Sequence, residues 1–433
     1  MKTLKKLMIN EIFFQSLLAF VVRGFAAVSG FILTYLLAIN LGAEQAGYFF
    51  LAFAIITFLS AIGRVGLDQT VLRQTAIGIV GNSTTVIFSV LKKSLLISGL
   101  LSTLLWFFVF FLSDYIAVEL FGKLGLASPL RSISFGLIGL SLLTLVAMSL
   151  QGLNRILNSV FVLSLAVNTL FILFLLLFDF STAAAAAFLY SILTVVVFFG
   201  ALFFWIIVAP VKKYKNKEVV SWTIIFNSCL PLSVVMIMSQ LIHWSGQLIA
   251  GAWIDPMEFS QLVVAQRIAM LASFVLIAVN LVVAPRFVKL HSQGDMDGLK
   301  ELVAYSVRLM LFFSIPILII MIFFSKQLVG LFGPEYTGGA KFLQILAIGQ
   351  FINTASGSVG YLLTLTGNEK SMRNTMLIAG FFAVAASLIL VPLYGATGGA
   401  IATALAVVLE NLIAVWFVRR RLGINTLAFW RRY

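Results

Sequence analysis

The chain consists of long apolar stretches separated by short polar breaks. Each stretch approaches the ~20 residues that a helix needs to cross a ~30 Å hydrocarbon core. Backbone groups that face lipid find no partner outside their own segment, so these stretches are expected to be helical. The pattern predicts an all-α polytopic membrane protein with about twelve transmembrane helices. Their approximate bounds are 12–39, 46–63, 93–113, 131–151, 159–178, 183–209, 222–251, 258–284, 302–324, 341–365, 374–392 and 398–418.

The overall composition excludes a soluble globular chain. Hydrophobic residues make up 61% of the 433 residues and charged residues 10%, against about 45–50% and about 25% in soluble proteins. Two histidines and one cysteine offer no cluster of metal ligands. A phosphate-binding GxxxxGK[ST] loop is absent from the sequence. We therefore expect no metal, no cofactor and no ATP hydrolysis by this chain.

Basic residues are distributed unevenly between the polar breaks. With the N-terminus placed in the cytoplasm, 22 of the 29 Lys and Arg residues fall on the cytoplasmic side, four on the opposite side and three inside spans. Short loops rich in Lys and Arg stay cytoplasmic, so this split predicts that the N and C termini are both cytoplasmic. The net charge of +14 then faces anionic lipid headgroups, and no nucleic-acid partner is expected.

The chain repeats itself weakly at an offset of about half its length. "LFGK" at Leu120–Lys123 pairs with "LFGP" at Leu331–Pro334, and "TAAAAAFLYS" from Thr182 pairs with "TGGAIATALA" from Thr397. Chance recurrence of small residues at helix starts is the alternative. Parallel repeats in one orientation are a transporter architecture, with the substrate path between the halves. The predicted domains are an N-terminal six-helix bundle, a cytoplasmic linker, and a C-terminal six-helix bundle with a basic cytoplasmic tail, at 1–210, 211–221 and 222–433.

Three stretches carry a resemblance to a known family. They are "LGAEQAGYFFLAFAIITFLSAIGRVGLDQTVLR" (Leu41–Arg73), "LFGPEYTGGAKFLQILAIGQFINTASGSVGYLLTLTGNEKSMRNTMLIAG" (Leu331–Gly380) and "VPLYGATGGAIATALAVVLENLIAVWFVRRRLGI" (Val391–Ile424). They resemble the polysaccharide and oligosaccharide flippases, including the O-antigen (Wzx-type) flippases, of the multidrug/oligosaccharidyl-lipid/polysaccharide exporter superfamily. The shared motifs are diffuse and built of Gly, Pro and apolar residues, so they indicate the fold better than the glycan.

The resemblance implies a fold like that of the multidrug and toxic compound extrusion (MATE) transporters. It also implies a function, which is to move an undecaprenyl-diphosphate-linked oligosaccharide from the cytoplasmic to the outer leaflet by alternating access. The unit would belong to O-antigen, lipopolysaccharide or a similar surface polysaccharide. The implied location is the bacterial cytoplasmic (inner) membrane. The implied partners are the lipid-linked substrate, membrane lipids, and a polysaccharide polymerase and ligase as candidates.

Arginines inside the predicted spans are candidate substrate-binding residues. Placing an ionisable group at membrane depth costs free energy, so such a residue indicates a functional site. Arg23 shares one helix face with Ala27, Gly30 and Thr34, a small and polar stripe that suits either a cavity wall or tight helix packing. Arg267 lies too deep in the eighth span for easy snorkelling. A guanidinium can bind a diphosphate through two parallel hydrogen bonds, so both arginines are expected to hold that group.

Other polar residues inside spans are candidates for sugar binding or ion coupling. Gln240, His243 and Gln247 share one face of the seventh span, where they could hydrogen-bond sugars or, alternatively, neighbouring helices. Glu410 in the twelfth span could pair with a basic group or carry a coupling proton, and His243 could titrate near neutral pH.

Two other functional classes are compatible with a chain of this hydrophobicity. An ion-coupled multidrug exporter of the same fold is the nearest alternative, because a fold does not determine its substrate. An integral-membrane glycan polymerase or ligase is more distant. The longest predicted external loops, 113–130 and 325–340, are short for such an enzyme. The expectation is a transporter and not an enzyme.

Overall fold

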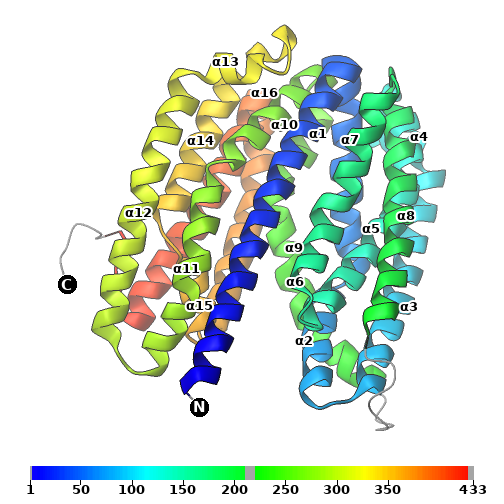
Figure 1. The fold of residues 1–433 in the computed structure, drawn as a ribbon. Coiled ribbons are helices and arrows are strands. Elements are labelled where there is room, and N and C mark those ends of the chain that lie inside the picture. Colours follow the sequence, from blue (N-terminus) through cyan, green and yellow to red (C-terminus); the bar gives the residue numbers. More distant parts are fainter. Residues whose placement is uncertain (1, 210–219, 428–433) are drawn as a thin grey trace. The chain divides into compact units, whose positions relative to one another are not determined.

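The computed structural model describes residues 2–209 and 220–427, without the side chains of residues 2–20 and Arg23. Within these ranges the protein is helical and contains no strand, so the predicted all-α class is confirmed (Figure 1). The helices pack into two compact units, Met1–Ile237 and Met238–Tyr433. The predicted linker at 211–221 falls almost entirely outside the described residues.

The first unit is arranged around one helix. Its helices are α1 (Lys2–Arg64), α2 (Leu67–Val80), α3 (Thr84–Phe111), α4 (Ser113–Tyr115), α5 (Ala127–Gly152), α6 (Ile156–Val160), α7 (Val167–Leu177) and α8 (Ala183–Val208). Helix α5 packs against α1, α2, α3 and α8. Small residues permit the close approach to α8, because a Cβ at Gly139 would lie 3.0 Å from the backbone nitrogen of Val195.

Helix α9 (Trp222–Trp253) crosses the boundary between the two units. Its first half packs within the first unit, where Ser228 accepts a hydrogen bond from Thr70 of α2 at 3.3 Å. Lys93 of α3 donates a hydrogen bond to the carbonyl of Val220, just before the helix, at 2.6 Å. Its second half packs within the second unit, where Ser245 pairs with Ser387.

The second unit contains two spans whose helices are interrupted. Its further helices are α10 (Pro256–Met270), α11 (Ser273–Ser292), α12 (Met296–Phe323), α13 (Ser325–Gly330), α14 (Ala340–Ala355), α15 (Val359–Leu365) and α16 (Glu369–Leu422). The predicted eighth span is α10 followed by α11, and the predicted tenth is α14 followed by α15. The sequence predicts each as one span without indicating the interruption inside it.

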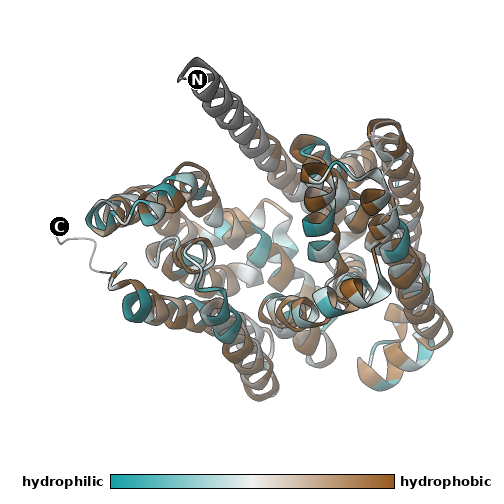
Figure 2. Ribbon diagram, turned by 90° about the horizontal axis from the view of Figure 1, so that it is seen from below, coloured by the Kyte–Doolittle hydropathy of each residue, from teal (hydrophilic) through white to brown (hydrophobic). Residues whose placement is uncertain are grey.

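Nine helical stretches in the described ranges are long and apolar enough to cross a membrane. Two of them contain a kink between predicted spans. Gly42 (φ 70°, ψ 166°) interrupts α1, and Gly395 (φ 57°, ψ −136°) interrupts α16. Large apolar side chains such as Phe107 and Phe203 are more than half exposed, as expected of a lipid-facing surface. The ribbon in Figure 2, coloured by residue hydropathy, shows that hydrophobic residues occur along all the helices of both units. The count of twelve spans and the cytoplasmic termini stay predictions.

Candidate functional site

A cavity of about 180 Å³ with several polar side chains in its lining lies inside the second unit. It is bounded by α11, by the interruption between α14 and α15, and by α16. Its lining consists of Leu276, Asn280, Asn353, Gly357, Ser358, Val359, Gly360, Tyr361, Met372, Glu410, Asn411 and Ala414. Polar side chains at this depth in a membrane protein mark substrate or ion pathways.

The interruption of the tenth span forms one wall of this cavity. The amide of Gly357 donates to the carbonyl of Thr354 at 3.1 Å, and the amide of Val359 donates to Gly357 at 2.9 Å, so the regular helical pattern is lost here. Gly357 has φ +77°, and a Cβ on it would lie 2.6 Å from Val307 Cγ2. Irregular backbone at membrane depth is tolerated where it is buried in protein or lines a cavity. Both conditions hold here.

Side-chain hydrogen bonds connect α11 to the interrupted span. Ser358 donates to Oδ1 of Asn280, and both side chains are buried. Ser273 at the start of α11 donates to Oε1 of Gln350 at 2.7 Å, and that same oxygen accepts from Asn353 at 3.3 Å. These amides and hydroxyls satisfy one another, which is the condition for a stable polar cluster at low dielectric. Glu410 adds a carboxyl group to the same lining.

The structure brings together Glu410 and His243, the two residues predicted as coupling candidates. They come from α16 and α9, and the imidazole of His243 is close enough to the carboxyl group of Glu410 for an electrostatic interaction. Nδ1 of His243 lies 2.9 Å from the carbonyl oxygen of Ser239. A carbonyl only accepts hydrogen bonds, so this contact is a hydrogen bond when Nδ1 carries the proton. The imidazole is exposed and the carboxyl half-buried.

The two predicted glutamines on α9 have different surroundings. Gln247 is 5% exposed and donates a hydrogen bond from Nε2 to Oε1 of Gln266 on α10 at 2.5 Å. Its amide is therefore engaged between helices, the alternative that the sequence left open. Gln240 is half-exposed on the same helix. Sequence reasoning missed Gln266, whose only signal was an amide next to the conspicuous Arg267.

Arg267 occupies the last turn of α10, directly before the interruption of the eighth span. Beyond it, Leu271 and Ala272 close tight turns by donating to the carbonyls of Ile268 at 3.0 Å and Ala269 at 3.1 Å. The Arg267 side chain is half-buried. Arg23 lies within α1, and its side chain is outside the described residues.

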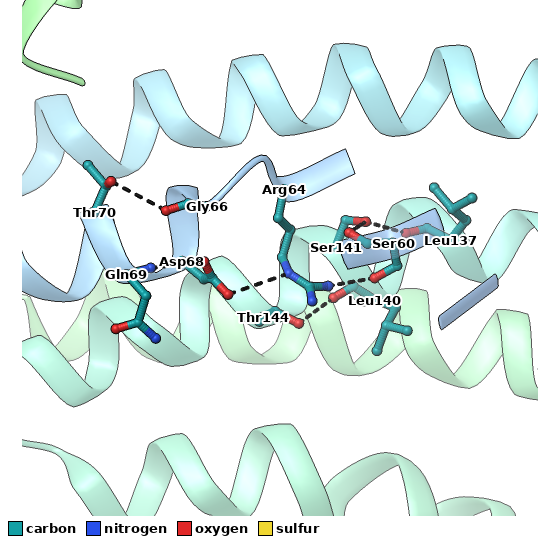
Figure 3. Close-up of polar contacts among 10 residues, drawn as sticks. All are labelled: Ser60, Arg64, Gly66, Asp68, Gln69, Thr70, Leu137, Leu140, Ser141 and Thr144. Carbon is teal, nitrogen blue, oxygen red and sulfur yellow. Dashed lines mark hydrogen bonds and ion pairs between the residues drawn. The ribbon is translucent and has the colours of Figure 1, made fainter. Parts of the chain in front are cut away.

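The first unit contains a buried charged residue that the sequence analysis did not single out. Arg64 ends α1 and is 8% exposed. Figure 3 shows its Nη1 donating to Oγ of Ser60 at 2.6 Å, while its Nε lies 3.9 Å from Oδ2 of the buried Asp68. Val65 (φ 46°) and Gly66 (φ 70°) turn the chain between these charges. Removing one partner of a buried ion pair destabilises a protein, because the other charge is left uncompensated. We therefore infer that Arg64 and Asp68 stabilise the α1–α2 turn.

Comparisons with known proteins identify relatives over nearly the whole chain. The model of the family described as polysaccharide biosynthesis protein matches residues 13–291, and the MatE family model matches residues 231–393. An uncharacterized membrane protein of Methanocaldococcus jannaschii is 24% identical, and the match covers 92% of this chain and 82% of that protein.

Several solved transporters share the fold. The lipid II flippase MurJ in an inward closed conformation matches with a TM-score of 0.74 at 17% identity, over 93% of this chain and 87% of that one. An inward-facing multidrug resistance MATE transporter matches with a TM-score of 0.76 at 15% identity, over 93% and 98%. A transporter of the MOP superfamily from Pyrococcus furiosus matches with a TM-score of 0.67 at 14% identity, over 97% of this chain and 96% of that one. At these identities the likeness shows the fold alone.

Proposed function

Because this chain belongs to the polysaccharide biosynthesis protein family, within the multidrug/oligosaccharidyl-lipid/polysaccharide exporter superfamily, we propose that it is a flippase for a lipid-diphosphate-linked oligosaccharide. The substrate is an undecaprenyl-diphosphate-linked unit of O-antigen or a similar surface polysaccharide. The site of action is the bacterial cytoplasmic membrane, and two bundles at about 1–210 and 222–433 alternate access to the two sides. The family match over residues 13–291 carries this proposal.

The chemistry of the cargo sets what the protein must supply. A polyprenyl tail can stay in lipid, whereas a diphosphate and its sugars need a polar path with positive charge. We assign the diphosphate to Arg23 and Arg267, because a guanidinium offers a planar pair of donors that an ammonium lacks. Sugar contacts fall to Gln240 and His243, with Gln247 limited by its existing bond to Gln266.

We further propose that Glu410 and His243 couple transport to a proton gradient. A half-buried carboxyl that interacts with an imidazole beside a polar cavity is suited to exchanging one proton as the conformation changes. The membrane potential adds about 2.3 kcal/mol per elementary charge per 100 mV. Transport should therefore collapse with an uncoupler and survive ATP depletion if the gradient is held and substrate is supplied.

The test of the substrate assignment is accumulation of the lipid-linked unit. Deleting the protein should leave lipid-diphosphate oligosaccharide facing the cytoplasm, and the wild-type chain should restore export. Arg23→Ala and Arg267→Ala should each reduce export at least about tenfold at normal abundance, and Arg→Lys should preserve part of it. Arg308→Ala is the matched control, since Arg308 is exposed on α12. Normal export by a stable Arg23→Ala, Arg267→Ala double variant would refute the diphosphate assignment.

An ion-coupled multidrug exporter is the second candidate, favoured by the MatE match to residues 231–393 and by the likeness to MATE structures. The two functions separate in one experiment. Cells that lack the protein should become sensitive to cationic drugs if it is an exporter, without a defect in surface polysaccharide. A polysaccharide defect without drug sensitivity supports the flippase.

The predicted topology has its own test. Reporter fusions after Lys217 and Arg421 should read as cytoplasmic, because the neighbouring segments are rich in Lys and Arg. Fusions after Asp179 and Glu335 should read as external. An external reading at Lys217 would contradict the division into six and six spans.

A further inference from the structure

A second cavity lies on the first unit, on its apolar outer surface. It has a volume of about 360 Å³ and lies between α3 and α8, each of which packs on α5. Seven of its lining residues are apolar or aromatic, and the eighth is a lysine. We call it the α3–α8 groove. Its lining is Phe88, Leu91, Lys92, Leu95, Leu96, Leu202, Trp205 and Ile206.

The floor of the groove is held in a fixed shape. Trp205 is 3% exposed, and its indole N–H donates to Oγ of Ser149 on α5 at 2.8 Å. The ring of Phe88 meets that indole edge-to-face, with centroids 4.8 Å apart. Because both aromatic side chains are held by neighbours, the groove exists before anything binds in it. Its rim is exposed, with Leu96 and Ile206 each 50% accessible.

The position of Lys92 along α3 places it at a membrane boundary. The stretch from Lys93 to Phe111 is about 28 Å long at 1.5 Å per residue, close to the thickness of the hydrocarbon core. Lys92 therefore lies at the headgroup level. On α3, Leu95 and Leu96 extend from it into the acyl-chain region, whereas Phe88 and Leu91 lie on its headgroup side. The groove residues of α8 lie near the end of that helix, at Leu202–Ile206.

The two neighbouring lysines of α3 differ in their surroundings. Lys93 donates to the carbonyl of Val220 at 2.6 Å, and its ammonium lies 4.6 Å from the centre of the Trp222 ring. Lys92 is exposed and belongs to none of the ion pairs within the described residues, which join Arg64–Asp68, Arg131–Asp114 and Lys300–Asp297. The groove lining contains no acidic side chain. A positive charge at the mouth of an apolar groove is complementary to a phosphate with an attached acyl chain.

We propose that the α3–α8 groove binds an anionic phospholipid, with its phosphate on the ammonium of Lys92 and an acyl chain along the apolar lining. Basic pockets between membrane helices are known to select anionic headgroups. With the predicted orientation this lipid belongs to the cytoplasmic leaflet. The site is independent of the cavity around Glu410 and of the transported substrate. It would hold α3 and α8 together on the lipid side of the first unit.

Native mass spectrometry of the purified full chain tests the proposal, with phosphatidylglycerol and phosphatidylcholine of the same acyl chains as probes. We expect the wild type to prefer phosphatidylglycerol about fivefold, the equivalent of the roughly 1 kcal/mol that one basic residue contributes near an anionic surface. Lys92→Ala should bring the preference close to one. Arg73→Ala removes another exposed positive charge of the first unit outside the groove, and should keep the preference.

A second variant tests the acyl-chain part of the site. Leu202→Trp fills the groove, so it should weaken binding of both lipids while leaving the helix content in detergent unchanged. Soluble glycerol phosphate should not compete, because it has no chain to bury. Three outcomes would each overturn the proposal. Lys92→Ala and Arg73→Ala could lose the phosphatidylglycerol preference equally, Leu202→Trp could bind lipid as well as the wild type, or glycerol phosphate could compete for the site.

Discussion

Ser358, at the interruption between α14 and α15, donates a hydrogen bond to the side-chain oxygen of Asn280 on α11. Both residues line the cavity that contains Glu410, and they are 3% and 6% exposed. The bond therefore joins a helix break to the helix facing it at the point where the regular backbone pattern ends. It determines the shape of the cavity wall beside the carboxyl group.

Removing one partner of this bond should cost more stability than removing both. Ser358→Ala leaves the buried Asn280 amide oxygen unpaired, so we expect a loss of about 1–3 kcal/mol in the free energy of unfolding. The double variant Ser358→Ala, Asn280→Leu should recover part of that loss, because it leaves no unpaired polar group. Denaturant unfolding in a fixed detergent measures both. If the double variant lost more free energy of unfolding than the two single variants together, that result would contradict a direct pair.

Glu410→Gln should uncouple transport from the gradient without unfolding the protein. The amide keeps the size of the side chain and cannot carry a proton, so gradient-driven transport in proteoliposomes should fall at least about tenfold. Substrate exchange without a gradient should persist near the wild-type rate. Glu301→Gln is the control, since Glu301 is exposed on α12. Undiminished uphill transport by Glu410→Gln would exclude this carboxyl from coupling.

Gly66→Ala should be more destabilising than Gly423→Ala, although both glycines have the same backbone conformation. Their φ angles are +70° and +68°. A Cβ at Gly66 would lie 2.6 Å from the amide nitrogen of Ser233 on α9, whereas a Cβ at Gly423 meets nothing within 4 Å. The left-handed conformation alone costs about 1–2 kcal/mol. We expect that cost at Gly423 and a larger one at Gly66, with the difference reporting the contact with α9.

Equal losses of thermal stability in these two glycine variants would show that α9 moves away from α2 at little cost. Such a result would also predict weak coupling between Thr70 and Ser228, whose hydroxyls are 3.3 Å apart at the same contact. The double-variant cycle of Thr70→Val and Ser228→Ala measures that coupling directly.

Tyr336 should make the protein sensitive to alkali. Its ring is buried in the loop before α14, and burial raises the pKa of its hydroxyl to about 12 from the ordinary 10. The folded state therefore holds a proton that the unfolded chain releases first. Its contribution is fully present below pH 10 and is lost as the pH rises to about 12. The melting temperature should fall more steeply over that range in the wild type than in Tyr336→Phe, and parallel curves would contradict the assignment.

The sequence by itself determined the class of this protein, because the length and apolarity of a membrane span are local properties that need no knowledge of the neighbours. It also singled out Glu410 and His243, since a charge at membrane depth is conspicuous in any single span. The family was likewise visible in the glycine- and proline-containing stretches, and the match to residues 13–291 confirmed it.

Only the tertiary structure decided which polar groups meet. Asn280, Ser358 and Glu410 are far apart in the chain, and their shared cavity depends on how three helices are rotated and packed. The interruptions after Met270 and Ala355 were equally hidden, because an apolar run reads the same whether its helix is continuous or broken. The burial of Arg64 was hidden for the same reason. In a span that is apolar on every side, the sequence does not indicate which face of the helix points inward. The partners of its few polar residues are therefore determined by packing alone.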